Sequence, residues 1–428
     1  MRVALVSSVA GFALLALSPG ALAAAGALDS TFDGDGRVTL DLGSSDEGAV
    51  DIAVQPDGKI VVLGTTGTSG VLARYNSTGA PDTTFDSDGV LVFSSIYPSA
   101  LALQPDGKIV VAGFAGGGWA VARFEGDGAV DSTFDTTGWI PEDYFDPSDI
   151  AGVALQSDGR IVVAGSTGAE HELGNGMIVR FHNDGTPDET FGGPRFGFRT
   201  WPIPSGTTGV AVQPNDKIVV VGWTIPGYDA DQTEAMAVAR YLPDGKPDSS
   251  FDGDGRARIM FGRRNVSVYS ASARPFDVAR QTADGKIVLA GHAGYDSDSD
   301  FALARFTSRG NIDTTFSDDG KRRMDFSGRE DEAQAVDIQP NGRIVVAGFA
   351  ASSEGSDEPD FALARYWPNG DLDRSFSGNG KQRVRFGSND QDSAFAVARQ
   401  ADGKLVVAGQ ATLATSASDL GLARLFGS

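Results

Sequence analysis

Three short motifs recur seven times along this chain, always in the same order, and they limit its possible folds more than any other feature. The first reads Gln-Pro-Asp-Gly-Lys-Ile-Val-Val-(Leu/Ala)-Gly with small variations, and its copies span residues 55–64, 104–113, 156–165, 213–222, 281–291, 339–348 and 400–409. The second is Ala-Arg-Tyr or a close variant, with its arginine at positions 74, 123, 180, 240, 305, 365 and 424. The third is Asp-x-(Thr/Ser)-Phe, with its phenylalanine at positions 32, 85, 134, 191, 251, 316 and 376. Repeats of this length indicate stacked supersecondary units.

Each copy contains four segments that favour β-strands. In the second copy, residues 100–103 are apolar, and the Pro-Asp-Gly that follows them suits a tight hairpin turn in which glycine takes a positive φ. Residues 108–112 include three consecutive β-branched residues, at 109–111, which indicates a strand buried on both faces. Residues 119–124 and 138–140 are the third and fourth candidates. No segment has a sustained helical period, so we predict an all-β chain.

Seven units of four strands fit a seven-bladed β-propeller, with repeats that start near residues 50, 99, 151, 207, 276, 333 and 393. An open β-solenoid is the alternative, but solenoid coils are shorter and their number is not fixed. The last repeat contains only three strand candidates, whereas a strand at 37–42 precedes the first repeat. We therefore predict that the N-terminal strand 37–42 completes the last blade. This pairing would close the ring and remove the exposed edges that invite aggregation.

The N-terminus predicts export. Residues 1–25 read as a signal peptide, with an apolar run from Val3 to Leu17 and an Ala-x-Ala cleavage site at 21–23. A membrane anchor is the alternative, but the apolar run is shorter than the ~20 residues that a spanning helix needs. Residues 26–428 then form a single propeller, which we expect to be a secreted, extracellular or cell-surface monomer with no membrane span.

Composition excludes several kinds of site and partner. The chain has no cysteine, which rules out disulfides, thiolate metal sites and a cysteine nucleophile. Its formal net charge of −22 repels phosphate backbones, so we expect no nucleic-acid partner.

The spacing between motifs separates two faces of the ring. The constant arginine and the next phenylalanine are always 11 residues apart, and the first motif varies by only one residue in length. The other two connections vary freely, from 10 to 18 residues and from 19 to 30 residues. Alternate loops of up-and-down blades lie on the same face, so one face, here called the constant face, carries both constant connections. The other, the variable face, carries loops 165–176, 222–235, 262–275, 291–300 and 348–360. Variable loops on a rigid scaffold are the usual carriers of binding.

An aspartate follows each constant arginine after eight residues, as in Arg74 and Asp82, and the seventh pair would join Arg424 to Asp29 across the ring closure. An anion-binding ring of arginines is conceivable. Because the pair repeats seven times, we interpret it as a charge-assisted brace of a tight loop, and each phenylalanine as core.

The variable face holds the residues that are most distinctive for binding. We predict ligand binding, to a glycan, another ligand or a protein partner, by the aromatic and acidic residues Trp119, Trp201, Trp223, Tyr228, Asp229, Asp231, Tyr295, Asp296 and Asp298. Aromatic rings beside carboxylates suit sugar stacking, although Trp119 and Trp223 could instead cap the core. The carboxylates could also bind calcium. The Asp-Gly-Asp-Gly segments at 33–36 and 252–255 lack the further ligands of an EF-hand loop and read as turns. Glu170-His171-Glu172 has no recognised metal spacing.

Catalysis has little support in the sequence. The three histidines, His171, His182 and His292, lie in different repeats, and no nucleophile elbow, phosphate-binding loop or zinc motif occurs. We assign no catalytic residue. A carboxylate-dependent extracellular enzyme, of the glycan hydrolase or lyase type, stays open as the alternative to a binding scaffold, because paired carboxylates are assembled in space and leave no sequence spacing.

The motifs resemble a known repeat. Segments 28–32 (Leu-Asp-Ser-Thr-Phe), 52–62 (Ile-Ala-Val-Gln-Pro-Asp-Gly-Lys-Ile-Val-Val) and 73–75 (Ala-Arg-Tyr) look like the delta-60 repeat of bacterial exported proteins, over about residues 28–426. They are also similar to NHL-type propeller repeats. The resemblance implies an extracellular or cell-surface repeat protein and supplies no reaction or catalytic residues. This chain departs from it where Asp follows the Phe and in the Asn215-Asp216-Lys217 turn.

Overall fold

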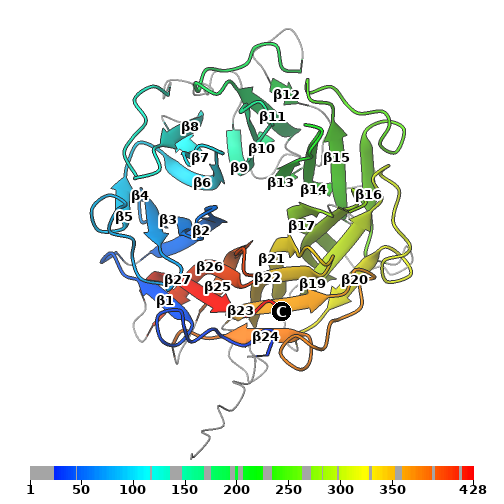
Figure 1. The fold of residues 1–428 in the computed structure, drawn as a ribbon. Coiled ribbons are helices and arrows are strands. Elements are labelled where there is room, and N and C mark those ends of the chain that lie inside the picture. Colours follow the sequence, from blue (N-terminus) through cyan, green and yellow to red (C-terminus); the bar gives the residue numbers. More distant parts are fainter. Residues whose placement is uncertain are drawn as a thin grey trace, which may run out of the picture.

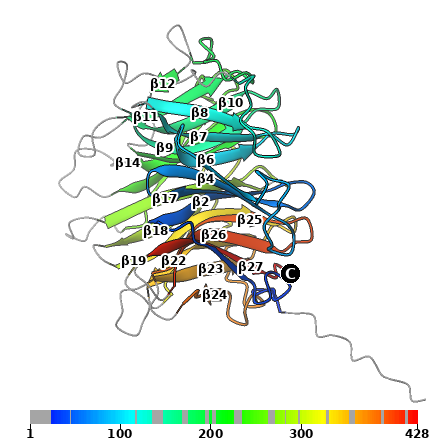
Figure 2. The same ribbon diagram turned by 90° about the vertical axis from the view of Figure 1, so that its left-hand side faces the viewer.

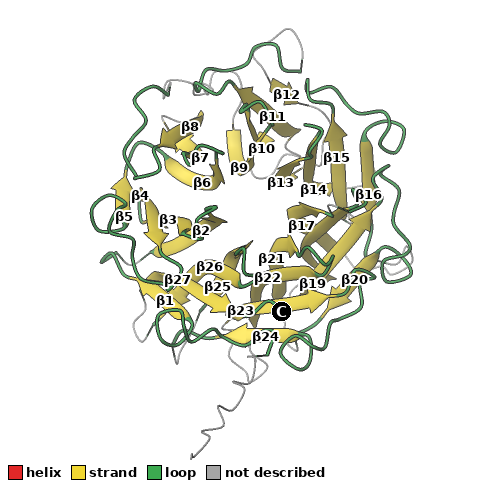
Figure 3. Ribbon diagram, viewed as in Figure 1, coloured by secondary structure: helices red, strands yellow, loops and turns green. Residues whose placement is uncertain are grey.

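The computed structural model describes residues 24–44, 46–115, 118–134, 147–167, 175–192, 198–200, 206–224, 234–262, 271–281, 283–295, 298–326, 330–351, 359–387, 391–413 and 417–428. These residues form seven antiparallel sheets arranged as the blades of a ring (Figure 1). They contain strands and turns only (Figure 3), and among them there is no helix able to cross a membrane. The predicted all-β, seven-bladed propeller is confirmed.

Each repeat supplies consecutive strands of one blade, counted from the innermost strand outwards. Blade 1 has β2 (Glu47–Val54), β3 (Ile60–Thr66), β4 (Ser69–Tyr75) and β5 (Val90–Phe93). Blade 2 has β6 (Tyr97–Leu103), β7 (Ile109–Ala115) and β8 (Gly118–Phe124). Blade 3 has β9 (Pro147–Leu155), β10 (Ile161–Thr167), β11 (Asn175–Phe181) and β12 (Phe198–Thr200). Blade 4 has β13 (Gly206–Val212), β14 (Ile218–Thr224), β15 (Ala235–Tyr241) and β16 (Arg256–Ile259).

The remaining blades follow the same order. Blade 5 has β17 (Ala271–Arg280), β18 (Ile287–Tyr295), β19 (Asp298–Phe306) and β20 (Lys321–Met324). Blade 6 has β21 (Asp331–Ile338), β22 (Ile344–Ala351), β23 (Pro359–Tyr366) and β24 (Lys381–Val384). Blade 7 has β25 (Ser393–Arg399), β26 (Leu405–Thr412), β27 (Ser418–Leu425) and β1 (Arg37–Leu40). Blade 2 is described with three strands, because the fourth strand predicted at 138–140 lies outside the described residues.

The ring closes in blade 7, as the sequence predicts. Strand β1 pairs antiparallel with β27, from Arg37 opposite Ala423 to Leu40 opposite Leu420, and Figure 1 shows the two strands side by side. The pairing ends at Leu40, two residues earlier than predicted. The backbone N–H of Leu42 donates instead to Glu47 Oε2, at 2.8 Å. The first and last parts of the chain therefore share one sheet.

The core lies between neighbouring blades. In the second strand of blade 1, residues 60–63 are fully buried at four consecutive positions. Val61 and Leu63 pack with Ile109 and Val111 of blade 2 in one hydrophobic cluster, while Ile60 and Val62 pack towards blade 7. The Ile-Val-Val runs are thus buried on both faces, as predicted, because each blade is covered by a neighbour on either side.

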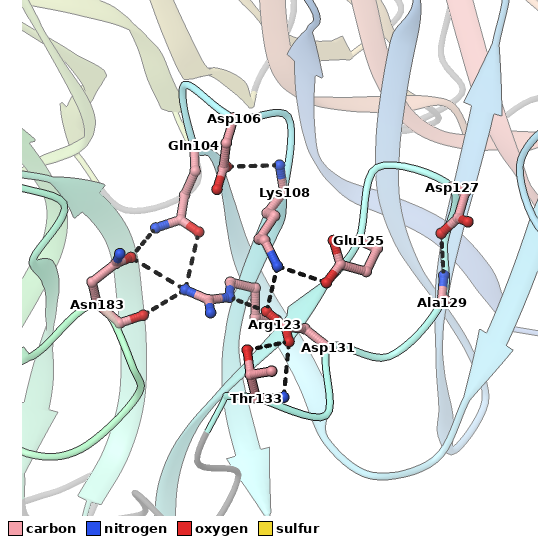
Figure 4. A network of polar contacts seen from close by, with 10 residues as sticks. All are labelled: Gln104, Asp106, Lys108, Arg123, Glu125, Asp127, Ala129, Asp131, Thr133 and Asn183. Atoms are coloured by element: carbon pink, nitrogen blue, oxygen red, sulfur yellow. Dashed lines mark hydrogen bonds and ion pairs between the residues drawn. The ribbon is translucent and has the colours of Figure 1, made fainter.

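The constant face is held by a repeated clamp, shown for blades 2 and 3 in Figure 4. Arg123 Nε donates to Asp131 Oδ2 at 2.7 Å, its guanidinium lies 4.6 Å from the ring centroid of Phe134, and its Nη1 donates to the carbonyl oxygen of Asn183 in the next blade. The Arg–Asp bond recurs at 2.7 or 2.8 Å in all seven copies. The carbonyl acceptors in the following blades are those of Gly126, Asn183, Pro243, Ser308, Pro368, Gly427 and Ser77.

The clamp shows that the constant arginines are structural. Each of the seven is at most 6% exposed and is already bound to a carboxylate, a ring and a neighbouring carbonyl. Their predicted role as braces is confirmed, and the structure adds that each one also joins two blades.

Figure 2 shows the ring from the side, with the strands crossing its thickness and the connecting turns on two opposite faces. Both described ends of the chain lie together beside the constant-face clamps. Gly26 N donates to Phe426 O at 2.7 Å, and the carbonyl oxygen of Gly427 accepts the clamp bond of Arg365.

Candidate functional site

A channel runs along the axis of the ring, where the seven innermost strands meet. Every one of these strands has a register shift against its neighbour, so that one residue is bulged, as Val50 is between Ala49 and Asp51. A β-bulge re-aims a side chain. The cavity on the axis has a volume of about 220 Å³. Its lining comes from all seven blades and comprises Val50, Asp51, Ser99, Ala100, Ala151, Gly152, Val153, Gly209, Val210, Phe276, Asp277, Gln334, Ala335, Phe395, Ala396 and Val397.

The constant glycine that ends the first motif makes room for each bulge. In blade 2 a Cβ added to Gly113 would lie 2.1 Å from the carbonyl oxygen of Tyr97. The motif is therefore constant at this position because the second strand approaches the backbone of the bulged inner strand closely.

Two carboxylates, Asp51 and Asp277, line the channel. Asp51 accepts hydrogen bonds from its neighbour Ile52 N at 2.7 Å and from Leu101 N of the next blade at 2.8 Å. Asp277 repeats this arrangement in blade 5, with Val278 N at 2.7 Å and Val336 N of blade 6 at 2.8 Å. Burial raises the pKa of Asp51 to about 7 and that of Asp277 to about 6, and the charge of Asp277 adds to the rise at Asp51. Each carboxylate thus joins two blades and has a pKa above its usual value of 3.8.

At the variable-face end of the channel, the copies differ most. Six residue types occupy the seven positions directly after the constant glycine, which are Thr65, Phe114, Ser166, Trp223, His292, Phe349 and Gln410. Opposite them on the innermost strands lie Gly48, Tyr97, Asp149, Gly206, Arg274, Glu332 and Ser393. We call these fourteen positions the mouth residues. The mouth residues vary from blade to blade, whereas the clamp residues are the same in every blade. The variable positions are therefore the expected place for a specific function.

A polar relay connects blades 5 and 6 at the mouth. Nε2 of His292 lies 2.9 Å from Ser272 Oγ, and its Nδ1 lies 3.2 Å from Glu332 Oε1 without the alignment of a hydrogen bond. Ser272 Oγ is also 2.7 Å from Glu234 Oε2. Because the serine hydroxyl has one proton, it donates either to His292 or to Glu234. In the second case, the Nε2–H of His292 donates to the serine. His292 is 9% exposed, and its imidazole lies between the hydroxyl of Ser272 and the carboxylate of Glu332.

A fixed guanidinium lies beside this relay. Arg274 donates from Nε and Nη2 to the two oxygens of Glu234, at 2.7 and 2.5 Å. Its guanidinium lies 4.5 Å from the ring centroid of Trp223, in the neighbouring blade 4. The hydrogen bond to Glu234 raises the pKa of Arg274. The two bonds to Glu234 and the stacking on Trp223 fix the orientation of the guanidinium, and 41% of the Arg274 side chain remains exposed.

The relay reaches the axial channel through two lining residues. The ring of Phe276 is 5.4 Å from that of His292, and Gln334 Nε2 donates to Glu332 Oε2 at 3.0 Å. The mouth network and the channel therefore form one continuous site, which spans blades 4, 5 and 6.

The residues predicted from the sequence have different places in the structure. Trp223 is part of the mouth network. Trp119 is 1% exposed and belongs to the core between blades 2 and 3, the structural role left open for it. Asp298 begins β19 and is exposed, and Tyr295 ends β18. Outside the described residues lie Trp201, Tyr228, Asp229, Asp231 and Asp296.

Sequence reasoning missed the relay residues Ser272, Arg274, His292 and Glu332. His292 was noted only as one of three scattered histidines. A signal was nevertheless present, because the position after the constant glycine is occupied by a different residue in nearly every copy. Comparing the copies at that single position would have placed Trp223 and His292 on equivalent strands of adjacent blades.

Solved structures that are similar to this chain share little sequence with it. Virginiamycin B lyase from Staphylococcus aureus is 11% identical, with 90% of this chain and 98% of that chain covered and a TM-score of 0.49. The polysaccharide lyase Uly1 is 13% identical, with coverage of 89% and 90% and a TM-score of 0.46. Sqt1 from Chaetomium thermophilum, bound to the N-terminus of ribosomal protein L10, is 12% identical, with coverage of 91% and 98% and a TM-score of 0.49. At this level of similarity no residue role is transferred to this chain.

The repeats themselves match a family model. No curated protein sequence matches the chain. The model described as "Domain of unknown function (DUF5122) beta-propeller" matches residues 55–85, 104–134, 156–191, 213–251, 282–316, 339–376 and 400–427. These segments cover more than half of the chain and contain the hairpin turn and the clamp arginine of each repeat, and the first six also contain the constant phenylalanine. The chain therefore belongs to the DUF5122 β-propeller family.

Proposed function

We propose that this protein is a secreted propeller that binds a ligand at the mouth of its axial channel, on the variable face. The observation that carries the proposal is the mouth network, in which Trp223, Arg274 and His292 converge from neighbouring blades beside a 220 Å³ cavity. Concave sites with a few convergent polar groups are the usual form of ligand sites. The clamp joins neighbouring blades, and the side chains at the mouth vary from blade to blade.

The chemistry of the mouth favours a polyhydroxylated ligand such as a glycan. Tyr97 is 46% exposed and Trp223 is half-buried, so both offer aromatic faces on which the apolar side of a sugar ring can stack. The guanidinium of Arg274 and the carboxylate of Glu332 are planar groups suited to hydroxyl recognition. The structure thus provides described counterparts for the aromatic and acidic residues expected from the sequence.

A binding screen with a matched pair of tryptophan variants tests this proposal. The purified protein is applied to a panel of bacterial and plant oligosaccharides, and the affinity of any hit is measured by calorimetry. We expect Trp223→Ala to weaken binding by about 5- to 150-fold, because a buried aromatic contact is worth on the order of 1–3 kcal/mol. Trp367→Ala is the control. Trp367 is also stacked under an arginine, with Arg343 4.3 Å from its ring, but it lies on the constant face.

The two variants separate the outcomes. Loss of binding in Trp223→Ala with normal binding in Trp367→Ala supports the mouth as the site. Equal affinities for wild type and Trp223→Ala would exclude it.

A second candidate function is acid–base catalysis at the same mouth. The observation that favours it is the position of His292 between Ser272 and Glu332, since a histidine held by a hydroxyl and a carboxylate can move a proton. His292→Gln keeps the size and polarity of the ring. An enzyme would lose turnover of a bound glycan in this variant while binding stays within a few-fold. Binding without any turnover by the wild type would leave the scaffold as the function.

We also propose that residues up to about 25 direct export and that the mature propeller is extracellular, as expected of a delta-60 type repeat. Ala25 O accepts a hydrogen bond from Ser377 N at 2.7 Å, so cleavage after Ala23 would keep this bond and cleavage after Ala25 would remove it. N-terminal sequencing of protein recovered from the culture medium of a bacterial host decides between these sites. An uncleaved chain retained in the cytoplasm would contradict the proposal.

A further inference from the structure

Three carboxylates meet on the variable face where blade 7 contacts blade 1. Asp419 lies in β27, Asp41 follows β1, and Glu47 begins β2, and one carboxylate oxygen of each lies within 4.8 Å of the other two. Asp419 is only 7% exposed. Among the described residues, no hydrogen-bond donor or basic side chain contacts its carboxylate. A buried carboxylate thus faces two others without a counter-charge, an arrangement that is costly unless a cation is supplied.

The same geometry recurs where blade 5 contacts blade 6. Asp300 in β19, Asp325 after β20 and Asp331 at the start of β21 also have carboxylate oxygens within 4.8 Å of one another. Asp331 is fully buried, and its Oδ2 accepts from Phe326 N at 2.6 Å. Its Oδ1 is buried with no hydrogen-bond partner. Burial raises the pKa of Asp331 to about 6; the charge of Arg383 opposes this rise, and the charges of Asp325 and Asp300 add to it. Here too, a buried oxygen lacks a partner at the centre of an acidic group.

The junction between blades 6 and 7 shows how the same place is neutralised. Asp360 is equivalent to Asp419 and Asp300, and Asp392 is equivalent to Glu47 and Asp331. Arg385 stands where the other two junctions have Asp41 and Asp325. Arg385 Nε lies 2.8 Å from Asp360 Oδ1. Both oxygens of Asp392 accept backbone hydrogen bonds at 2.9 Å, from Phe386 N and Thr412 N. At this junction the positive charge comes from the chain itself.

One aspartate of each group, which is buried as Asp360 and Asp419 and partly exposed as Asp300, is not a requirement of the blade. It occupies the position five residues before the constant arginine, as Asp300, Asp360 and Asp419. The first four copies have Ser69, Gly118, Asn175 and Ala235 there. The clamp aspartate, in contrast, occurs in all seven copies. The triads are therefore additions to the fold, and an addition that buries like charges needs a separate explanation.

We propose that the two all-acidic triads, Asp41–Glu47–Asp419 and Asp300–Asp325–Asp331, each bind a calcium ion that joins two blades. In this arrangement the ion takes the place that the Arg385 guanidinium holds at the third junction. This goes beyond ligand binding at the mouth and does not depend on it.

The donor set selects the type of ion. All the donors are carboxylate oxygens, which hard divalent cations prefer, and the described triads include no histidine. Calcium–oxygen distances are about 2.4 Å, so two oxygens on one ion lie at most about 4.8 Å apart. The ion would complete its shell with water, since Asp41 is exposed. Arg323 already pairs with Asp300, whereas no described cation pairs with the first triad, so the junction of blades 7 and 1 holds calcium more tightly.

Calorimetric titration of the chelator-treated full chain with CaCl₂ tests the proposal. We expect two bound ions per chain and a melting temperature that rises with calcium concentration, since an ion that binds only the folded state stabilises it. Asp41→Arg should remove the tighter site and Asp325→Arg the weaker one. In each variant the introduced guanidinium reproduces the geometry of Arg385, so the protein should stay folded without calcium.

The reverse variant is the sharpest control. Arg385→Asp should create a third calcium site, because Arg383 lies beside Asp360 as Arg323 lies beside Asp300. If an arginine variant fails to fold, Asp41→Asn and Asp325→Asn provide the same loss of ligand. Circular dichroism of each variant, recorded in the presence of a chelator, shows whether the protein is folded without calcium. The proposal is overturned if wild type takes up no calcium, if Asp41→Arg/Asp325→Arg binds as much as wild type, or if magnesium binds as tightly as calcium.

Discussion

Arg424, in the last strand of the chain, donates from Nε to Asp29 Oδ2 at 2.8 Å, near the first described residues. This pair has the same geometry as the six clamps formed within single repeats. The closure of the ring therefore uses the ordinary repeat contact, with one partner supplied by each end of the chain. Ring closure and the stability of each repeat therefore depend on the same contact, and the same kind of variant tests both.

Deleting residues 28–42 should destabilise the whole propeller. The deletion removes β1, which covers the outer edge of β27, and it leaves the buried guanidinium of Arg424 without Asp29. Deleting residues 1–23, the segment that precedes the described residues, is the control. The expected result is a markedly lower melting temperature for the first deletion only, measured by circular dichroism. Melting of the 28–42 deletion at the wild-type temperature would show that closure does not stabilise the ring.

Replacing one clamp arginine should cost about 3–5 kcal/mol of unfolding free energy, the usual cost of removing one partner of a buried ion pair. Arg365 is 1% exposed and bonds both Asp373 and the carbonyl oxygen of Gly427 in the next blade. Arg365→Lys should lose most of this contribution, because an ammonium group cannot reproduce the fork. Arg37→Ala removes the exposed pair with Asp35 and should cost less than about 1 kcal/mol. Urea unfolding compares the variants, and equal costs for Arg365 and Arg37 would refute the clamp.

Gly113→Ala should destabilise blade 2 by about 1–3 kcal/mol or more, the range for overpacking a filled core. The new Cβ would lie 2.1 Å from the carbonyl oxygen of Tyr97, so the bulge beside the channel must shift. Gly48→Ala is a matched control on an innermost strand, where the nearest atom to the new Cβ is 3.5 Å away. Urea unfolding midpoints measure both. A harmless Gly113→Ala would mean that the bulge adapts freely.

Stability should fall as the pH rises from about 4 to about 7 because of the channel carboxylates. Burial raises the pKa of Asp51 to about 7 and of Asp277 to about 6, from a usual value of 3.8. Between pH 4 and pH 7 the two carboxyl groups keep their protons in the folded protein but have lost them in the unfolded chain. Raising the pH therefore lowers the free energy of unfolding until the groups of the folded protein also ionise. Other charges near Asp277 are Asp337, whose charge raises the pKa of Asp277 further, and Arg399, which lies 3.2 Å from Asp337.

The double variant Asp51→Asn/Asp277→Asn isolates this effect. Asparagine resembles the protonated acid, so the variant should lose the part of this decrease in stability that Asp51 and Asp277 contribute, while the part from Asp331, whose pKa is also raised to about 6, remains. Asp57→Asn, an exposed carboxylate on the constant face, should leave the pH profile unchanged. Urea unfolding midpoints of the variants and wild type, measured at pH 5 and pH 8, test this prediction. If the double variant and wild type show the same difference between these pH values, the channel carboxylates are not the cause.

The repeated contacts were predictable from the sequence because they recur at fixed spacings. The eight-residue interval between Arg74 and Asp82 predicts the pair of Arg424 with Asp29. The last repeat lacks a fourth strand, which predicts that β1 completes the last blade. The mouth was not predictable in this way, since Ser272, His292 and Glu332 come from strands whose separation varies. Asp51 also looked like an ordinary strand residue, because a bulge leaves no signature in one copy. The acidic triads became visible only when residues of adjoining blades were placed together.

The meeting of both chain ends on the constant face has a practical consequence for how the molecule is presented. A tag, a linker or a further domain joined before Ala25 or after Ser428 would extend from the side opposite the mouth. Anchoring the protein to a surface through either end therefore leaves the mouth turned towards the medium.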